Sequence, residues 1–589
     1  MRIDRLCLPN YKNLKNFVVD FDETKSKQVI VGQNGTGKSN LLEAITTIFR
    51  DLDLGQMPGD DKDVPAFEFE IDYCCNGHEI AISCYRTPQE KEGKTKRRAK
   101  TVVKNGYERR IFARPIEKKS RGEENSLPPS NSDSLESKRE ALRSNAWELS
   151  SSSFYKLNEN LSTRLLPRYV FGYYSGVSNR FDKLFSKHEE RYYRAQIDGE
   201  EQALRRLFQA KPLLHSQFAL LAFLARRDEQ ALSFLKEEFE IEDVVSVLFA
   251  LRQPYWSKSR RKAEPVTEDT EGDSRFWGVR GKVKPFLYSL YKYAFAPMAG
   301  FERMTIARGR EENFERRYLY LTGDSIKSVA RDADTPKEFF ARLESTAFSS
   351  ILSESGEDLR IRIKLSGGKD SISFQELSEG QRQLLTVIGL MRFTGEDESL
   401  FLLDEPDTHL NPAWAINYLA NLQKYGIEPH NSQVLMTTHS PLVFAGLMKE
   451  EVVILEKSRE GHISSSHPVS DPRGMGFAAI LTSRFFGLRS SLDVKTSKRL
   501  DRLRDLSMRN IRTPKQERLI QLYNDHLRSI DFSQQVRDPL FNEFVAAMHE
   551  LRGNNPTLWT TTLSSEQLDL RKAMAEEVLR KIRAKNALD

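Results

Sequence analysis

The residues best suited to chemistry lie in two parts of the sequence. The first, residues 32–39, reads Gly-Gln-Asn-Gly-Thr-Gly-Lys-Ser, and its glycines leave backbone N–H groups free to converge on phosphate oxygens. A helix that begins here adds the positive end of its dipole. Lys38 would reach the β- and γ-phosphates, and the Ser39 hydroxyl would hold Mg²⁺. The segment therefore predicts an ATP site formed by Asn34, Gly35, Thr36, Gly37, Lys38, Ser39 and Asn40.

The second part begins with an apolar run at 399–403 that ends in Asp404-Glu405-Pro406. Asp404, at the end of a buried strand, is expected to provide the second contact to Mg²⁺, directly or through water. Glu405 beside it is placed to polarise the attacking water as a general base. Another apolar run leads to Thr437-Thr438-His439-Ser440. This order of segments predicts hydrolysis of a nucleotide, with Lys38 and Glu405 in catalytic roles.

Between these parts, residues 377–381 read Leu-Ser-Glu-Gly-Gln. This segment resembles the signature of ABC-type ATPases, with Glu379 where transporters usually carry glycine. The chain is similar to the soluble branch of that class (SMC, RecF and OLD proteins) over roughly 1–195 and 300–470. The resemblance implies that two heads close around two ATP molecules. It assigns further ATP-site roles to the signature residues Ser378 and Gly380, which act in trans, to Gln381 of the same segment, to the D-loop Asp407, and to the catalytic switch histidine His439.

A second segment, Leu365-Ser366-Gly367-Gly368-Lys369, looks even more like the transporter signature. It lies between two runs in which apolar and polar residues alternate, and Gly-Gly between such runs is typical of a hairpin turn. It also lacks the glutamine. The sequence therefore predicts a turn at this position.

Composition limits the remaining possibilities. The chain has 589 residues, enough for two to four domains. Its apolar content is 39%, its mean hydropathy is −0.56, and no apolar run approaches the ~20 residues needed to cross a membrane. The beginning of the sequence has no signal-peptide pattern, and Cys7, Cys74, Cys75 and Cys84 lack metal or C-x-x-C spacing. We expect a cytoplasmic protein with no membrane contact.

The predicted fold class is α/β: an ABC-type, SMC/RecF-like ATPase head with a mixed sheet, an antiparallel β-subdomain, a short helical insert and a helical C-terminal region. Residues 1–195 would form the N-terminal half of the head, with a hairpin at 67–84 and a disordered loop at about 116–153. Residues 196–300 have apolar spacing typical of helices. Residues 301–470 would complete the head, and 471–589 would form helices, one of them starting at the capping box Thr513–Gln516.

Four segments allow more than one interpretation. The basic runs at 94–100 and 257–262 either contact nucleic-acid phosphates or are solvated loops. The strand at 169–174 occupies the place of the Q-loop of ABC heads but has no glutamine; Arg180, which follows it, is a candidate phosphate contact. The C-terminal helices either bind a second protein or merely cover the sheet.

The outline of the chain also resembles the PtuA ATPases of Septu anti-phage systems, through its short insert, Tyr-Tyr-Ser-Gly, Leu-Ser-Glu-Gly-Gln-Arg-Gln, Asp-Glu-Pro and Thr-Thr-His-Ser-Pro. That resemblance implies a homo-oligomer formed through the heads and a small HNH nuclease (PtuB) as partner. Retron-associated members add a reverse transcriptase and its RNA–DNA product. Residues 457–589 lack the Toprim pattern of OLD nucleases, so no intrinsic nuclease is predicted. The alternative is a RecF-like repair ATPase that binds DNA directly.

Overall fold

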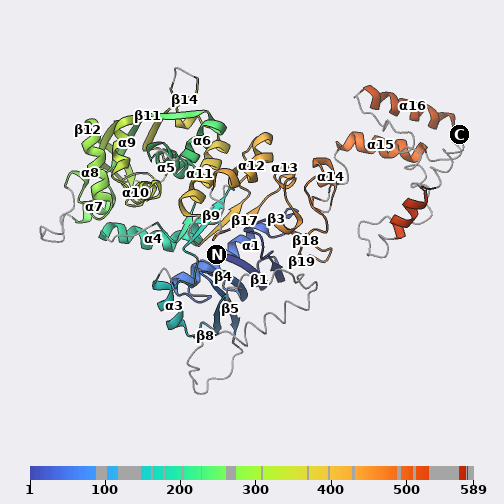
Figure 1. The fold of residues 1–589 in the computed structure, drawn as a ribbon, viewed down its shortest axis with the longest axis horizontal. Helices are drawn as coiled ribbons and strands as arrows, with labels where there is room; N and C mark the ends of the chain where they lie inside the picture. The colour runs from blue at the N-terminus through green and yellow to red at the C-terminus, as the bar shows by residue number, and fades with distance from the viewer. Residues whose placement is uncertain are drawn as a thin grey trace, which may run out of the picture. The chain divides into compact units, whose positions relative to one another are not determined.

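The structure is a computed structural model of the whole chain (Figure 1). It describes residues 1–87, 102–116, 147–160, 163–176, 180–199, 204–226, 229–260, 274–306, 310–353, 355–367, 371–395, 398–426, 431–483, 485–486, 488, 492–507, 513–529, 570–578 and 580. The chain divides into two compact units, Met1–Leu488 and Arg489–Asp589. The basic run at 94–100 lies outside the described residues.

The sheet that carries the phosphate-loop segment lies at the centre of the first unit. Its strands run in the order β10-β9-β16-β17-β3-β18-β19, and all neighbours are parallel except β18 and β19. Strand β16 is buried along its whole length, as expected for a parallel sheet covered on both faces. The strands are β3 (Lys27–Gly32), β9 (Tyr169–Tyr174), β10 (Leu207–Gln209), β16 (Ser399–Asp404), β17 (Gln433–Thr437), β18 (Val452–Lys457) and β19 (Ile463–Ser466).

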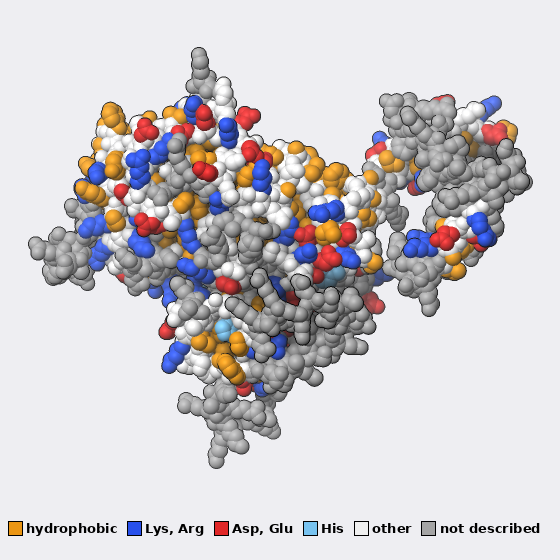
Figure 2. Space-filling model, in the orientation of Figure 1, with side chains coloured by type: hydrophobic (Ala, Val, Ile, Leu, Met, Phe, Trp, Pro, Cys, Tyr) orange, Lys and Arg blue, Asp and Glu red, His pale blue; other side chains and the backbone are white. Residues whose placement is uncertain are grey.

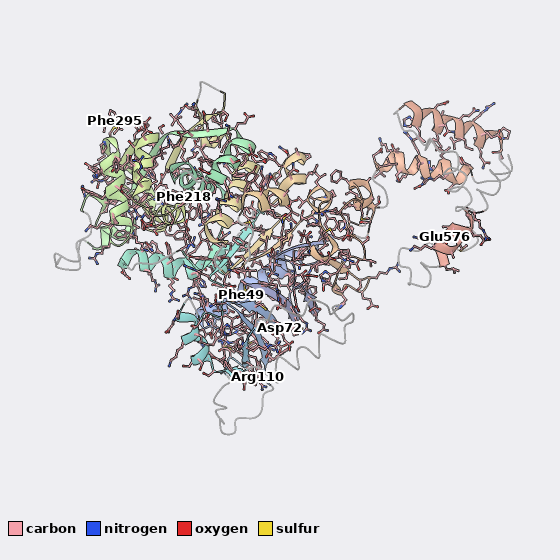
Figure 3. The ribbon with its side chains drawn as sticks, in the orientation of Figure 1. Phe49, Asp72, Arg110, Phe218, Phe295 and Glu576 are labelled. Carbon is pink, nitrogen blue, oxygen red and sulfur yellow. The ribbon has the colours of Figure 1, made fainter. Side chains whose placement is uncertain are left out.

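An antiparallel sheet forms the β-subdomain, in the order β2-β1-β4-β5-β7-β6 with β8 beside β7. The expected hairpin is confirmed: β4 pairs with β5 across a turn in which Asn76 and Gly77 have φ of 48° and 73°. Phe49 of helix α1 (Lys38–Leu54) lies in the core beneath this sheet (Figure 3). The strands are β1 (Arg2–Tyr11), β2 (Leu14–Asp20), β4 (Phe69–Cys75), β5 (His78–Arg86), β6 (Val102–Lys104), β7 (Tyr107–Pro115) and β8 (Trp147–Leu149).

A third sheet, sheet C, has the order β12-β13-β11-β14-β15 and is antiparallel. The expectation of helices throughout 196–300 does not hold, because β11 lies inside that range; its alternating buried Val247, Phe249 and Leu251 are a strand pattern. The turn predicted near Gly367 (φ 78°) is confirmed between β14 and β15. The strands are β11 (Ile241–Arg252), β12 (Phe295–Ile306), β13 (Arg310–Thr322), β14 (Leu359–Leu365) and β15 (Ser371–Ser373).

Helices pack on these sheets, and Phe218 of α5 is fully buried among them (Figure 3). Two segments differ from the sequence analysis: β8 lies and α3 begins within the loop expected at 116–153, and residues 257–260 belong to α7. The helices are α3 (Ser151–Glu159), α4 (Asp182–Asp198), α5 (Pro212–Arg226), α6 (Glu229–Phe239), α7 (Tyr255–Arg260), α8 (Val283–Tyr293), α9 (Gly323–Arg331), α10 (Pro336–Phe348), α11 (Glu379–Thr394), α12 (Pro412–Tyr425), α13 (Pro441–Phe444) and α14 (Phe477–Thr482).

The second unit contains α15 (Val494–Ser507) and α16 (Pro514–Ser529), which meet through Leu500, Leu503 and Leu527. The capping box expected at the start of α16 is present: Thr513 N donates to Gln516 Oε1 (2.9 Å), and Gln516 N donates back to Thr513 Oγ1 (3.4 Å). Within the described residues, no helix has both the length and the apolar character needed to cross a bilayer.

Candidate nucleotide site

The phosphate-loop segment connects β3 to α1 in a conformation that requires glycine at two positions. Gly35 and Gly37 have φ of 83° and 88°, a region that side chains disfavour. A Cβ on Gly37 would also come within 2.7 Å of Leu14 Cδ2. From the loop between β1 and β2, Asn13 Nδ2 donates to Gly35 O (2.8 Å). The first hairpin of the chain therefore supports the loop from outside.

Lys38 begins α1 and is 5% exposed. Its ammonium donates to Gly32 O at 3.0 Å and to Gln33 O at 3.5 Å, both on the loop that precedes it. Burial lowers the pKa of Lys38, and the nearby charges of Glu405 and Asp404 oppose that effect. A phosphate oxygen is a stronger hydrogen-bond acceptor for an ammonium than a peptide carbonyl is. A bound phosphate can therefore take the place of the two carbonyl groups that Lys38 contacts.

Asp404 ends β16 at the same edge of the sheet and is 2% exposed. Thr437, at the end of neighbouring β17, donates its hydroxyl to Asp404 Oδ1 (2.5 Å) and accepts a hydrogen bond from Glu405 N (3.1 Å). Burial raises the pKa of Asp404, whereas hydrogen bonds from Ser39 and Thr437 lower it. The structure thus brings the two expected Mg²⁺ residues, Ser39 and Asp404, into contact.

Glu405 has a left-handed backbone, with φ of 51°. A non-glycine residue in this region is uncommon, and such strain concentrates at functional sites. Its side chain turns toward the switch segment, where His439 Nε2 lies 3.0 Å from Glu405 Oε1. The hydrogen bond from His439 lowers the pKa of Glu405, which favours the ionised form that a general base requires.

Asp407 lies behind Glu405 and is 7% exposed. Thr438 donates its hydroxyl to Asp407 Oδ2 at 2.7 Å, so the expected D-loop residue is tied to the switch segment. Burial raises the pKa of Asp407 to about 6. The predicted residues Asp404, Glu405, Asp407 and His439 therefore form one connected group through the two threonines, Thr437 and Thr438.

The signature residues lie at the start of α11. Ser378 Oγ accepts from Gln381 N (3.2 Å), and Gln381 Oε1 accepts from Ser378 N (2.8 Å), which forms a capping box. A Cβ on Gly380 would lie 2.5 Å from His409 O, so only glycine allows α11 to approach the segment after Asp407. Ser378 is exposed and bonds its own helix, at the positive end of the helix dipole.

Sequence reasoning missed Glu43, which is the centre of a second set of contacts around α1. Glu43 is 5% exposed and pairs with Lys12 and with Arg180, whose Nε lies 2.6 Å from Glu43 Oε2. Arg180 also donates to Asn40 Oδ1, and Asn40 donates to Asn13. Residues of α1 thus hold Arg180 next to the phosphate loop. A polar residue on a buried helix face, Glu43, is the signal that could have revealed this network.

The arrangement fits ATP and Mg²⁺. Glycines with positive φ, the N-terminus of α1 and a buried lysine form a cradle for phosphate. The described residues contain no group of three or more His, Cys, Asp or Glu side chains that could hold a metal ion. Mg²⁺ uses one or two protein ligands and completes its shell with phosphates and water. Ser39 and Asp404 would be those ligands, and the ion would neutralise phosphate charge.

Fold and site together define an ATPase of the AAA/ABC type. Two families match the chain: the one described as "AAA domain, putative AbiEii toxin, Type IV TA system" matches residues 180–445, and "AAA ATPase domain" matches residues 1–211. Such domains use ATP together with Mg²⁺. The two matches overlap at residues 180–211, which contain α4 and β10, so the phosphate-loop half and the signature half of the head are both recognised.

More particularly, the chain resembles PtuA and RecF over short segments. It is 33% identical over 95 residues to Septu protein PtuA of Bacillus mycoides, which covers 16% of this chain and 13% of PtuA. It is 39% identical over 70 residues to the DNA replication and repair protein RecF of Lactobacillus acidophilus, which covers 12% of this chain and 18% of RecF. The matches thus span less than a fifth of either relative's length.

Two solved structures of Smc heads also align with the chain. One is an Smc head bound to the C-terminal winged-helix domain of ScpA, with 12% identity, a TM-score of 0.27, and coverage of 80% of this chain and 98% of the other. The second is an Smc head with an extended coiled coil bound to the C-terminal domain of ScpA from Pyrococcus furiosus, with 14% identity, a TM-score of 0.27, and coverage of 80% and 96%. The assignment to ATPases rests on the family matches and the site.

Proposed function

We propose that this chain is the ATP-binding and ATP-hydrolysing subunit of an anti-phage complex that regulates a separate HNH nuclease. ATP hydrolysis is supported by the contacts among Asp404, Glu405 and His439 at the edge of the sheet. Glu405 contacts His439, and Thr437 joins Glu405 to Asp404. The resemblance to Septu protein PtuA supports the defence part. Septu ATPases work with a small HNH nuclease, and we expect no intrinsic nuclease in this chain because residues 457–589 lack the Toprim pattern.

Within this proposal the chain forms dimers or higher oligomers through its heads. The hydroxyl of Ser378 and the N-terminus of α11 would bind the γ-phosphate held by Lys38 of a second copy. The exposure of Ser378 and its position at a helix N-terminus support this role. ATP would then act as the link between two heads, and hydrolysis initiated by Glu405 would release them.

The second unit would bind the nuclease. Its helix α16 carries Leu519 and Leu522, which are 38% and 63% exposed, on a helix that packs on α15 by another face. Exposed leucines on a helix are a common means of docking to a protein partner. In a retron-associated system, the reverse transcriptase and its RNA–DNA product would join the same complex.

Glu405→Gln tests the enzymatic proposal. The variant should bind ATP like the parent and hydrolyse it at least about 100-fold more slowly, because it loses the general base but no phosphate contact. Lys38→Ala is the matched control and should lose ATP binding itself. Normal turnover in Glu405→Gln would refute the assignment of the base. Full defence by Lys38→Ala would indicate a scaffold in which hydrolysis is incidental.

Native mass spectrometry of the tagged chain, purified from its own cell with ATP, tests the partner proposal. Several ATPase copies with a small HNH protein would support defence. A bare dimer, or one that carries only DNA, would favour the second candidate, a RecF-like repair ATPase, to which the 39% identity with RecF over 70 residues also points. That candidate predicts an ATPase stimulated by DNA, and neutralising Lys96, Arg97 and Arg98 should abolish the stimulation.

A further inference from the structure

Sheet C buries one face and leaves the other open. On β14, Leu359, Ile361 and Ile363 are buried, whereas the intervening residues are all basic and exposed: Arg360, Arg362 and Lys364. The buried side chains of the sheet belong to the core formed with α5, α6, α8 and α9. Figure 1 shows these helices on one side of β11 and β14. The opposite face carries no helix from the described part of this chain.

The strand register places aromatic side chains in a row on the open face. Phe295 of β12 is opposite Tyr320 of β13, Tyr320 is opposite Leu248 of β11, and Leu248 is opposite Arg360 of β14. Residues opposite each other lie on the same face of a sheet. Phe295 is 74% and Tyr320 42% exposed, and Phe295 projects from the end of the sheet in Figure 3. The row ends in a cation.

A second row runs beside the first. Met298 of β12, which is 64% exposed, is opposite Tyr318 of β13, and Tyr318 is opposite Ala250 of β11. The flat ring of Tyr318 and the small side chain of Ala250 thus extend the surface formed by the first row. Figure 2 shows hydrophobic side chains next to lysine and arginine side chains over the end of the molecule where β12 lies. We call the outward residues Leu248, Phe295, Met298, Tyr318, Tyr320, Arg360, Arg362 and Lys364 the open face.

The charges on the open face favour an anionic ligand. Three of its acidic neighbours are paired: Glu242 with Lys364 (2.7 Å), and both Glu302 and Asp358 with Arg316. Arg362 donates to Ser371 O (2.8 Å), a neutral acceptor, so its positive charge is not cancelled. Arg360 has no acidic partner among the described residues. The β14 edge of the aromatic rows is therefore positively charged.

The edge of the sheet is poorly suited to pairing with a protein strand. β12 is the edge strand, but its register shifts between Phe295 and Met298, Ala296 has a φ of 47°, and Pro297 has no N–H to donate. Bulges and prolines are devices that block strand addition. A ligand of the exposed aromatic side chains would therefore bind across the open face and not along the edge of β12.

We propose that the open face binds single-stranded nucleic acid, with bases stacked on Tyr320 and Phe295 and phosphates at Arg360 and Arg362. Aromatic side chains on an open antiparallel sheet can stack two or three bases, and stacking tolerates any base. The row from Phe295 to Arg360 crosses three strand spacings, about 14 Å, enough for such a short segment. This site is separate from the nucleotide site and does not depend on the proposed defence role.

The first test measures binding of a fluorescein-labelled oligothymidine of ~20 nucleotides to the full chain by fluorescence anisotropy at about 50 mM salt. Tyr320→Ala should weaken binding about ten-fold through loss of one stacking contact, whereas Tyr320→Phe should bind like the parent. Tyr255→Ala, a 64% exposed tyrosine on α7, is the control and should have no effect. Equal loss in Tyr255→Ala and Tyr320→Ala, or no binding by the parent, would overturn the proposal.

The second test separates phosphate contacts from stacking. Arg360→Ala should reduce the slope of log K against log salt by about 0.7, the value for one phosphate of a single strand. Arg459→Ala, an exposed arginine in the turn between β18 and β19, is the control. The Tyr320→Ala variant could instead lose its oligomeric state and bind the oligonucleotide as tightly as the parent. That result would refute the proposal and identify the open face as a contact between copies of the chain. ATP turnover without DNA should be the same in all variants.

Discussion

The carboxylate of Glu344 on α10 is the centre of a fully buried polar cluster. Arg205 donates to Glu344 Oε1 (2.8 Å), and His215 Nε2 lies 3.1 Å from Glu344 Oε2. Lys211 N also lies 2.7 Å from His215 Nδ1, which fixes the orientation of the ring. The cluster is therefore a buried ion pair, Arg205–Glu344, that His215 completes. It anchors α5, the helix on which α11 packs.

We predict that Glu344→Gln lowers the free energy of unfolding by about 3 kcal/mol at neutral pH. Burial alone would raise the pKa of Glu344, but His215 and Arg205 lower it from 4.5 to about 2. At ~1.36 kcal/mol per pH unit, that difference corresponds to about 3 kcal/mol. The value agrees with the ~3–5 kcal/mol lost when one partner of a buried pair is removed. Since the pKa is depressed, this stability is present above pH 4.5 and is lost as the pH falls toward 2.

Urea unfolding followed by tryptophan fluorescence measures this loss. Trp256 reports on the end of α10, because its Nε1 donates to Ser349 O (2.9 Å). Glu190→Gln is the control: Glu190 pairs with Arg194 on α4, but both side chains are largely exposed, so the cost should stay below about 0.5 kcal/mol. Equal destabilisation by Glu344→Gln and Glu190→Gln at pH 7 would refute the reasoning.

Two further predictions concern the nucleotide site. Thr437→Val removes the hydroxyl that contacts Asp404 and Glu405 N, so ATP turnover should fall about 10- to 100-fold. Thr437→Ser keeps the hydroxyl and should turn over ATP at nearly the parent rate. Similar rates for the two variants would show that the hydroxyl does not position Asp404 and Glu405. The raised pKa of Asp407, about 6, means that its contribution to stability is complete below pH 3.8 and is lost as the pH rises through 6. Asp407→Asn should therefore flatten the dependence of the urea midpoint on pH between about 4 and 6, and an unchanged slope would refute the assignment.

The parts of the molecule that could be predicted from sequence are those set by local chemistry. The segment at 32–39 requires glycines wherever it occurs, and β16 is a short apolar run followed by Asp404, which fits only a buried parallel strand. The hairpin at β4 and β5 likewise follows from alternation and the Asn76-Gly77 turn. The capping boxes of α11 and α16 are signals of the same kind.

Features set by tertiary contacts could not be read in this way. The strand β11 lies among helices, and its partners β13 and β14 come from residues 310–322 and 359–365, so its pairing is invisible locally. Arg180 reaches Glu43 across 137 residues of sequence. The open face of sheet C exists only because four strands align in register. Each of these depends on distant residues meeting, which composition and periodicity do not encode.

The left-handed backbone of Glu405 has a consequence for how this chain can evolve. A left-handed conformation costs a non-glycine residue roughly 1–2 kcal/mol. Replacement by glycine, or by asparagine, would relax the backbone and remove the carboxylate that contacts His439. Selection for stability alone would therefore favour glycine or asparagine at this position. If Glu405 is the proposed general base, its presence here is a trade-off in which activity is kept at the expense of about 1–2 kcal/mol of stability.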